Sequence, residues 1–293
     1  MKPAFLSTVT TVGLTVAIAS ASAMPLQFRQ SEPAVGARQS NTYHGPGSQA
    51  RGQNQQSATE ASAPQEPWMR DQEVMRTRTG GTEFVVRVEN ISSFDAMVYS
   101  DGSSQAAGFS HGVYAVHGSG WPVYQPGEPT PFVSGLEALA EDGNVRPMQP
   151  YLERHPDVAE SGIFYKPVGS DTDAELWPGV VFEFRVTANP GENLSFATML
   201  MQSNDIVYGP RDGRIALFDA DGRPISGDIS ASLGIFDAGT ELNEDPKSGP
   251  NVGVNQSGLN TGISEEDVVR APNDGFTYPA PEQVLKVTIQ PVG

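Results

Sequence analysis

Length, composition and charge exclude several classes of protein: the chain has 293 residues, no cysteine, and 35 acidic against 18 basic side chains. Its net charge of −17 repels nucleic acid and anionic membrane surfaces, so neither is expected as a partner. Without cysteine the fold depends on burial alone or on help from a metal, which should then be a hard cation held by oxygen.

The first 23 residues have the features of an export signal. Lys2 precedes an apolar run at 4–19, and the small residues Ala21, Ser22 and Ala23 close the segment. Serine and threonine dilute the run, whereas a bilayer span needs roughly 20 strongly apolar residues. We therefore expect cleavage after Ala23, a secreted or periplasmic location, and no membrane insertion after cleavage.

The segment 24–81 has the composition of a disordered linker. Glutamine, serine, glycine and proline dominate it, and it has few aliphatic residues and no helical or strand period. Such a segment cannot bury enough apolar surface to offset the entropy that an ordered chain loses. One folded domain is therefore expected at 82–293.

The ordered part of the chain begins with a strand at 83–91. Phe84, Val86 and Val88, followed less regularly by Ile91, form one buried face of a period-two pattern, which is typical of a half-buried strand. The same pattern predicts four more strands, at 180–186, 194–200, 214–218 and 284–289.

The segments between these strands are rich in turn residues. The chain has 31 Gly and 24 Pro, and one short helix is predicted, at 133–141. Short strands separated by turns favour an antiparallel sandwich or barrel over alternating strands and helices.

Residues 108–112 match the G-x-S-x-G pattern of serine hydrolases. That motif needs its serine on a sharp turn from a strand into a helix. The residues that follow, 113–117, have a strand-like pattern instead. We therefore expect no enzyme, with a hydrolase using Ser110 as an alternative.

Two acidic stretches follow apolar segments. One is Ser203-Asn204-Asp205, and the other covers 237–243. Carboxylates at the ends of different strands can meet at one rim of a sandwich, where they supply the oxygen ligands that calcium prefers. Because Asp and Asn also cap turns, the residues alone leave both interpretations open.

Several of these short motifs, in this order, resemble the spondin domain in its cysteine-free bacterial form. They are 110–117, 126–128, 135–143, 194–200, 203–205 and 237–241, within a resemblance that covers about Thr82 to Pro291. The resemblance implies an all-β fold, an antiparallel β-sandwich of C2-like, Greek-key topology that binds a divalent cation, as in the animal members F-spondin and mindin.

The resemblance also implies metal ligands. The family's metal-site aspartates match Asp205, where Asn204 replaces the family's proline, and Asp237. An acidic residue on an earlier strand completes the animal site, and Glu183 is the nearest candidate. We therefore expect Asp205, Asp237 and Glu183 to hold Ca²⁺.

The animal members act in matrix attachment, cell adhesion and pattern recognition. The resemblance therefore implies a secreted binding or adhesion module with an extracellular protein or glycan ligand. Neighbouring repeat domains and disulfides of the animal proteins are missing here, so their partners do not transfer. A structural matrix or surface component without a metal is the main alternative.

Overall fold

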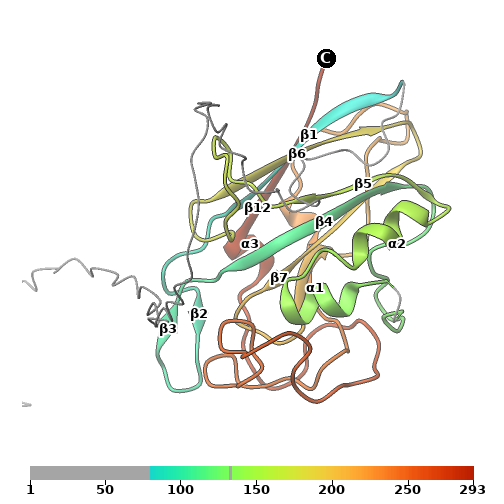
Figure 1. Ribbon diagram of the computed structural model, residues 1–293. Helices are drawn as coiled ribbons and strands as arrows, with labels where there is room; N and C mark the ends of the chain where they lie inside the picture. The colour runs from blue at the N-terminus through green and yellow to red at the C-terminus, as the bar shows by residue number, and fades with distance from the viewer. Residues whose placement is uncertain (1–79, 132–133) are drawn as a thin grey trace, which may run out of the picture. The chain divides into compact units, whose positions relative to one another are not determined.

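The computed structural model describes residues 80–131 and 134–293, and these form an antiparallel β-sandwich with a helical layer on one side (Figure 1). The predicted signal, nearly all of the predicted linker, and Val133 of the predicted helix lie outside these residues. Within the described ranges, no helix has the length and apolar character to cross a membrane.

The first sheet has four strands in the order β10-β12-β1-β6. These are β1 (Thr82–Asn90), β6 (Val181–Ala188), β10 (Gly227–Asp228) and β12 (Leu285–Pro291), and all neighbours are antiparallel. At the end of β1 the buried residue is Asn90, whereas Ile91, predicted on the buried face, is 42% exposed. The Asn90 amide donates hydrogen bonds to the carbonyl oxygens of Ala107 and Leu176, which satisfies its burial.

The second sheet has the order β11-β8-β7-β4-β5, with β9 paired to β7. Its strands are β4 (Phe109–His117), β5 (Val158–Phe164), β7 (Asn193–Leu200), β8 (Ile206–Pro210), β9 (Ile215–Ala216) and β11 (Leu233–Asp237). The remaining elements are the hairpin β2 (Met97–Val98) and β3 (Ser104–Gln105), the helices α1 (Leu136–Asp142), α2 (Met148–Arg154) and α3 (Pro281–Val284), and a 3₁₀ turn at Ser230–Ser232.

Two hydrophobic cores lie on opposite faces of the second sheet. The aromatic core between the sheets includes a stacked pair, Phe164 and Phe184, with ring centroids 5.1 Å apart. On the other face, Leu139 of α1 and Leu152 of α2 pack in the same cluster as Ala197 of β7. Strand β7 is therefore buried along both faces, so the half-buried pattern predicted for 194–200 is wrong there.

The predicted all-β antiparallel sandwich is confirmed, and each of the five predicted strands has a counterpart. The strand predicted at 214–218 is reduced to the two residues of β9. In both sheets, strands far apart in sequence are neighbours, as with β1 between β6 and β12. The chain thus crosses between the sheets repeatedly, as a Greek-key sandwich requires.

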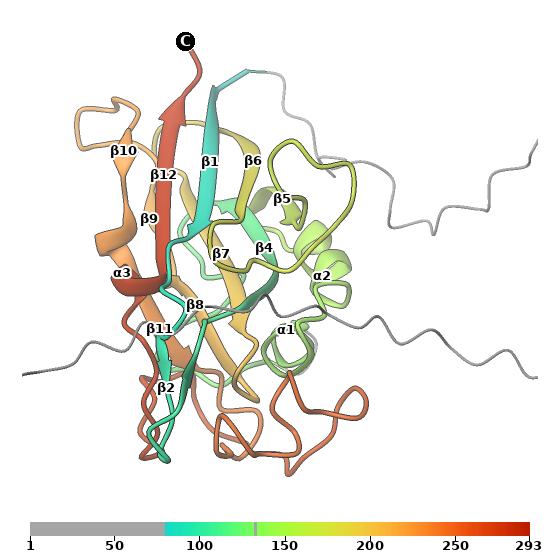
Figure 2. The same cartoon turned by 90° about the vertical axis from the view of Figure 1, so that its left-hand side faces the viewer.

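A long connection, residues 238–280, runs from β11 to α3 and folds over one end of the sandwich. Figures 1 and 2 show it as the orange-red loops at the lower end, near α1 and the β2–β3 hairpin. It is tied there by hydrogen bonds from the Gly253 N–H to the Ser203 carbonyl and from the Val269 N–H to the Glu128 carbonyl. We call this end of the molecule the loop end.

His117, the last residue of β4, gives the domain a defined acid sensitivity. Its buried ring contacts the Ser195 hydroxyl at 2.7 Å, and burial lowers its pKa from 6.5 to about 4. A group with a lowered folded pKa stabilises the fold above its unfolded pKa, and that stability is lost as pH falls through the lower value. With any divalent cation removed by a chelator, lowering the pH from 6.5 to 4 should reduce the free energy of unfolding by on the order of 3 kcal/mol through protonation of His117.

The measurement is the free energy of unfolding of wild type and His117→Gln across that pH range. Because the other titrating groups are common to both proteins, the difference between the two curves isolates His117. A difference that is flat from pH 7 to 4 would contradict the assignment.

Candidate metal site

The structure brings Asp205 and Asp237 together at the loop end. Asp205 immediately precedes β8, and Asp237 is the last residue of β11. These strands are antiparallel, with Asp237 opposite Ile206, so the start of one meets the end of the other. The Ala238 N–H also donates to the Asp205 carbonyl oxygen at 3.0 Å.

Asp205 is fully buried, and only half of its carboxylate is hydrogen-bonded. Its Oδ2 accepts the backbone N–H groups of Thr240, at 3.1 Å, and Glu241, at 3.3 Å. Its Oδ1 is buried without any hydrogen-bond partner. Burial, and then the negative charge of Asp237, raise the pKa of Asp205 well above its usual value. A buried oxygen left in this way is costly unless a cation or a proton satisfies it.

Asp237 is also buried, but both of its oxygens have partners. Oδ1 accepts the N–H of Gly239 at 2.8 Å, and Oδ2 accepts the side-chain amide of Asn243 at 2.7 Å. The Arg270 guanidinium lies 3.0 Å from Oδ2. Burial raises the pKa of Asp237, and the N–H groups and Arg270 oppose that shift.

Arg270 is the positive charge that the chain supplies at this site. Besides Asp237, it contacts Glu265 at 2.9 Å and Asp267 at 2.8 Å. Its backbone exchanges two hydrogen bonds with Asp237, which holds the 267–270 segment against the end of β11. Three carboxylates therefore share one guanidinium, and Asp205 adds a fourth acidic group beside them.

Glu183 does not join the two aspartates. It lies on β6 in the other sheet, where Phe182 and Phe184 on either side of it face the core. Because successive side chains of a strand point to opposite faces, Glu183 points outward. There its carboxylate pairs with Arg87 on β1 at 2.8 Å. The expectation that Glu183 completes the site is thus not met.

The donor atoms at the aspartate pair suit a hard cation by their chemistry. Besides Asp205 Oδ1, the side-chain oxygen of Asn243 is buried without a hydrogen-bond partner. Across residues 80–131 and 134–293, no three His, Cys, Asp or Glu side chains are grouped so as to hold a metal ion. An ion here would therefore be held by Asp205 and Asp237 together with neutral oxygens, in competition with Arg270.

Ser110 lacks the geometry of a nucleophile elbow. It lies within the extended strand β4 rather than on a turn into a helix. Its hydroxyl donates to the His111 carbonyl oxygen at 2.6 Å and accepts the Met199 N–H at 3.1 Å. Both interactions hold the hydroxyl within the sheet. The His111 ring lies 3.9 Å from Glu175 and borders the same small pocket as Ser110, but within the described residues no hydrogen bond joins the His111 ring to the Ser110 hydroxyl.

Sequence reasoning did not identify Arg270 or Glu141 as parts of the loop end. Arg270 lies 33 residues after its partner Asp237, in a segment without periodic pattern. Glu141 lies on the predicted helix, where acidic residues usually face solvent, yet it is buried. Only the three-dimensional packing of the 238–280 connection, against the end of β11 for Arg270 and against α1 for Glu141, reveals both.

A comparison of the chain with protein-family models finds no matching family, and a comparison with curated proteins finds no match. The relation to spondin domains therefore stays a prediction from the motifs.

Replacing Arg270 should show how much the loop end depends on this one positive charge. In Arg270→Met, three carboxylates lose their shared partner, so the free energy of unfolding at pH 7 in chelator should fall by roughly 2–4 kcal/mol. The loss should shrink toward pH 4, as the carboxylates take up protons. Chemical denaturation at both pH values measures this.

The matched control is Arg185→Met, which removes an exposed ion pair with Glu83 on the four-stranded sheet. Exposed pairs contribute about 0–1 kcal/mol, so this variant should stay close to wild type. Equal destabilisation in the two variants would show that Arg270 has no special role.

Proposed function

We propose that the chain is an exported, spondin-like binding module whose loop end holds Ca²⁺ at Asp205 and Asp237 and presents the 238–280 connection to an extracellular ligand. The observation that carries this proposal is Asp205 Oδ1, a buried carboxylate oxygen without a hydrogen-bond partner, next to a second buried carboxylate. Calcium binds through such oxygens, completed by neutral oxygens and water.

The charge balance supports an ion from outside the chain. Placing two carboxylates out of contact with water costs several kcal/mol unless positive charge compensates them. Arg270 is already shared with Glu265 and Asp267, so it compensates the aspartate pair only in part. Bound calcium would supply the remaining charge and would tie β8 to the turn after β11.

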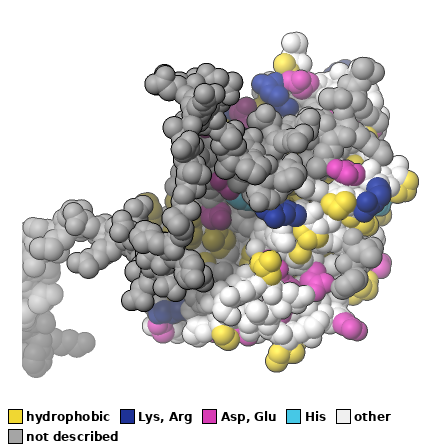
Figure 3. Space-filling model, viewed as in Figure 1, with side chains coloured by type: hydrophobic (Ala, Val, Ile, Leu, Met, Phe, Trp, Pro, Cys, Tyr) yellow, Lys and Arg dark blue, Asp and Glu magenta, His cyan; other side chains and the backbone are white. Residues whose placement is uncertain are grey.

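The connection around this site exposes several apolar side chains. Four aliphatic residues of the connection are exposed: Leu242, Val254, Leu259 and Ile263. Two of them are joined by a hydrogen bond from the Leu242 N–H to the Ile263 carbonyl oxygen. Figure 3 shows acidic and hydrophobic side chains scattered over this end of the molecule. Such a mixed surface is of the kind found at protein–protein interfaces, and we propose a protein as the ligand.

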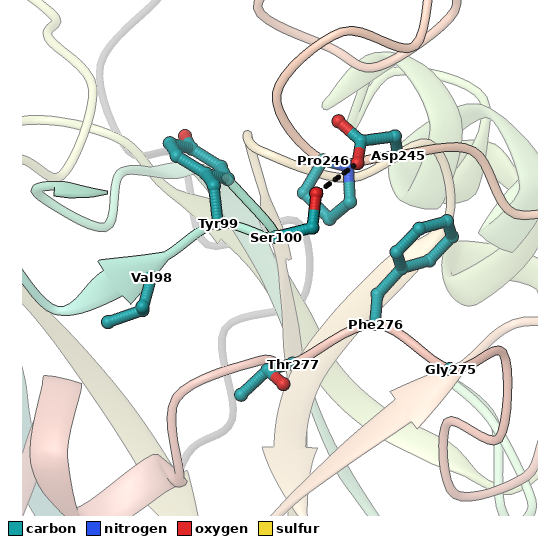
Figure 4. A pocket seen from close by; sticks show the side chains of 8 residues that line it. All are labelled: Val98, Tyr99, Ser100, Asp245, Pro246, Gly275, Phe276 and Thr277. Carbon is teal, nitrogen blue, oxygen red and sulfur yellow. Dashed lines mark hydrogen bonds between the residues drawn. The ribbon is translucent and has the colours of Figure 1, made fainter. Parts of the chain in front are cut away.

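A small pocket lies at the same end, between the β2–β3 hairpin and the connection (Figure 4). Its volume is about 180 Å³, and Tyr99 and Phe276 are among its lining residues. A hydrogen bond from Ser100 to Asp245 joins the hairpin to the connection at this point. Because drug-sized ligands need about 300 Å³ or more, the pocket suits one side chain of a protein partner.

Asp205→Asn tests the calcium site with opposite expectations in two conditions. In chelator the change removes the negative charge of a buried carboxylate that has one unpartnered oxygen and a second carboxylate beside it, so the melting temperature should stay equal or rise. At calcium concentrations near a hundred times Kd, wild type should gain roughly 5–10 °C, which the variant should not gain. Differential scanning calorimetry of the mature chain in both conditions measures the two effects.

Asp171→Asn is the control, because Asp171 carries the same charge at an exposed position in another loop. It should gain as much from calcium as wild type does. If wild type and Asp205→Asn respond equally to calcium, the ion does not bind at Asp205. If wild type does not respond at all, the alternative of a structural component without a metal is favoured.

A further inference from the structure

A groove runs along the helix α2, which packs on the second sheet beside β5, away from the loop end (Figure 1). We call it the α2 groove, and its lining residues are Pro147, Tyr151, Arg154, His155 and Pro156. The first four are spaced as residues on one face of a helix are. The buried side chains of α2, Met148 and Leu152, lie on the neighbouring face and anchor the helix to the sheet.

The size and lining of the α2 groove are those of a small-ligand site. Its volume is about 370 Å³, within the roughly 300–1,000 Å³ typical of such sites. Tyr151 and the two prolines supply flat apolar surface, Arg154 and His155 supply polar groups, and no acidic residue lines the groove. Apolar walls with a few polar groups are the usual composition of a ligand pocket.

Arg154 is a positive charge that the fold does not use. Its side chain is exposed, and no carboxylate of the described residues forms an ion pair with it. This is notable in a chain with 35 acidic and 18 basic residues. A guanidinium presents paired donors whose geometry matches a carboxylate. Arg154 is therefore available to bind an anionic group in the groove.

His155 and Tyr151 add hydrogen-bonding groups beside Arg154. The His155 Nδ1 accepts the Asp157 backbone N–H at 3.3 Å, so the proton of the neutral ring is on Nε2, which is then a donor. The Tyr151 ring packs edge-on against the His155 ring, with centroids 5.6 Å apart. Within the described part of the chain, the Tyr151 hydroxyl has no hydrogen-bond partner. Three groups that can donate hydrogen bonds thus line one groove.

The acidic residues closest in sequence do not neutralise this groove. Glu153 follows Tyr151 by two residues on α2, a spacing that places the two side chains on different faces. The Asp157 carboxylate accepts the Gly120 N–H, and a Cβ on Gly118 would lie 2.7 Å from its Oδ1, so it faces the 118–120 loop. Charges farther away are screened within about 8 Å at physiological salt. The groove is therefore locally basic although the whole chain is acidic.

The combination of donors and flat apolar walls selects among anionic ligands. A small inorganic anion would use the donors but would leave the surface of Tyr151 and the prolines uncovered. An apolar ligand would leave Arg154 unpaired. A carboxylate carried on a sugar ring satisfies both, because the ring packs on the apolar surface and its oxygens accept hydrogen bonds.

We propose that the α2 groove binds an acidic sugar, a uronic acid unit of an extracellular polysaccharide. Arg154 binds the carboxylate, the His155 Nε2–H and the Tyr151 hydroxyl bind ring and hydroxyl oxygens, and the prolines pack against the ring. This site shares no residue with the loop end, so it stands whether or not calcium binds at Asp205. It would give the protein a glycan site separate from the protein-binding surface proposed for the 238–280 connection.

The experiment is a nuclear magnetic resonance titration of ¹⁵N-labelled residues 24–293 in chelator, which removes any binding that calcium mediates. The probes are three trisaccharides, of galacturonic, glucuronic and mannuronic acid. At least one should bind saturably, with the largest amide shifts at 147–156. Its carboxyl-reduced form keeps the rings and loses the charge, so its affinity should be at least tenfold lower.

Two variants test the assigned contacts. Arg154→Met should weaken the acidic trisaccharide at least tenfold, because it removes a charge-assisted hydrogen-bonded pair. Tyr151→Phe keeps the ring and loses the hydroxyl, so it should weaken binding roughly two- to tenfold. The matched control is Arg223→Met, which removes the same charge from an exposed turn and should bind as wild type does. Near-ultraviolet circular dichroism verifies the fold of each variant.

Four results would overturn the proposal. The first is that none of the three trisaccharides binds saturably. The second is equal affinity in wild type and Arg154→Met, and the third is equal affinity for the acidic and carboxyl-reduced forms. The fourth is that inorganic phosphate, or the peptide acetyl-Gly-Ala-Ala with its free carboxylate, binds the groove as tightly as the sugar does, which would make it a general anion site or a peptide site.

Discussion

A carboxylate without access to water organises one end of this protein. Asp205, at the start of β8, accepts the backbone N–H groups of Thr240 and Glu241 and thereby fixes the turn that follows β11. The pairing of β11 with β8 places Asp237 beside Asp205, and the turn directs the rest of the connection toward α1. The sandwich supplies the rigid frame for this arrangement, because β7 and β8 are packed on both faces. The same contact leaves the other oxygen of Asp205 without a partner, which makes the loop end dependent on charge from elsewhere.

Charge balance, more than apolar burial, therefore limits the stability of this end. The chain offers Arg270 to Asp237, Glu265 and Asp267, whereas no Lys or Arg of the described residues forms an ion pair with the buried Glu141 and Glu241. Evolution commonly retains such unfavourable groups where they bind something, since apolar replacements would stabilise the fold more. A cation that binds only the folded state would convert this local cost into stability that depends on ion concentration. The conformational order of the 238–280 connection, which is the surface proposed for a ligand, would then also depend on the ion.

Particular elements show how much the sequence could predict. Alternation in β1 predicted its buried face except at the end, where Asn90 is buried because its amide finds two carbonyl oxygens. Strands β5, β8 and β11 were missed, because short segments covered on both faces, or at a sheet edge, show no clear period two. The motifs paired Asp205 with Asp237 correctly in space, since both flank strand ends. Glu183 does not join the two aspartates, because successive side chains of a strand point to opposite faces and its position on β6 directs it outward. The contacts of Arg270, Glu141 and Glu241 depend on long-range packing that no local pattern encodes.

The most direct test is a high-resolution crystal structure of residues 24–293 grown with millimolar calcium, with an anomalous difference map to identify the ion. The account predicts a calcium peak about 2.3–2.6 Å from Asp205 Oδ1, with the carboxylate of Asp237 in the same coordination shell. A map that shows Asp205 Oδ1 bonded only to water or to a protein donor, with no anomalous peak at the loop end, would contradict it.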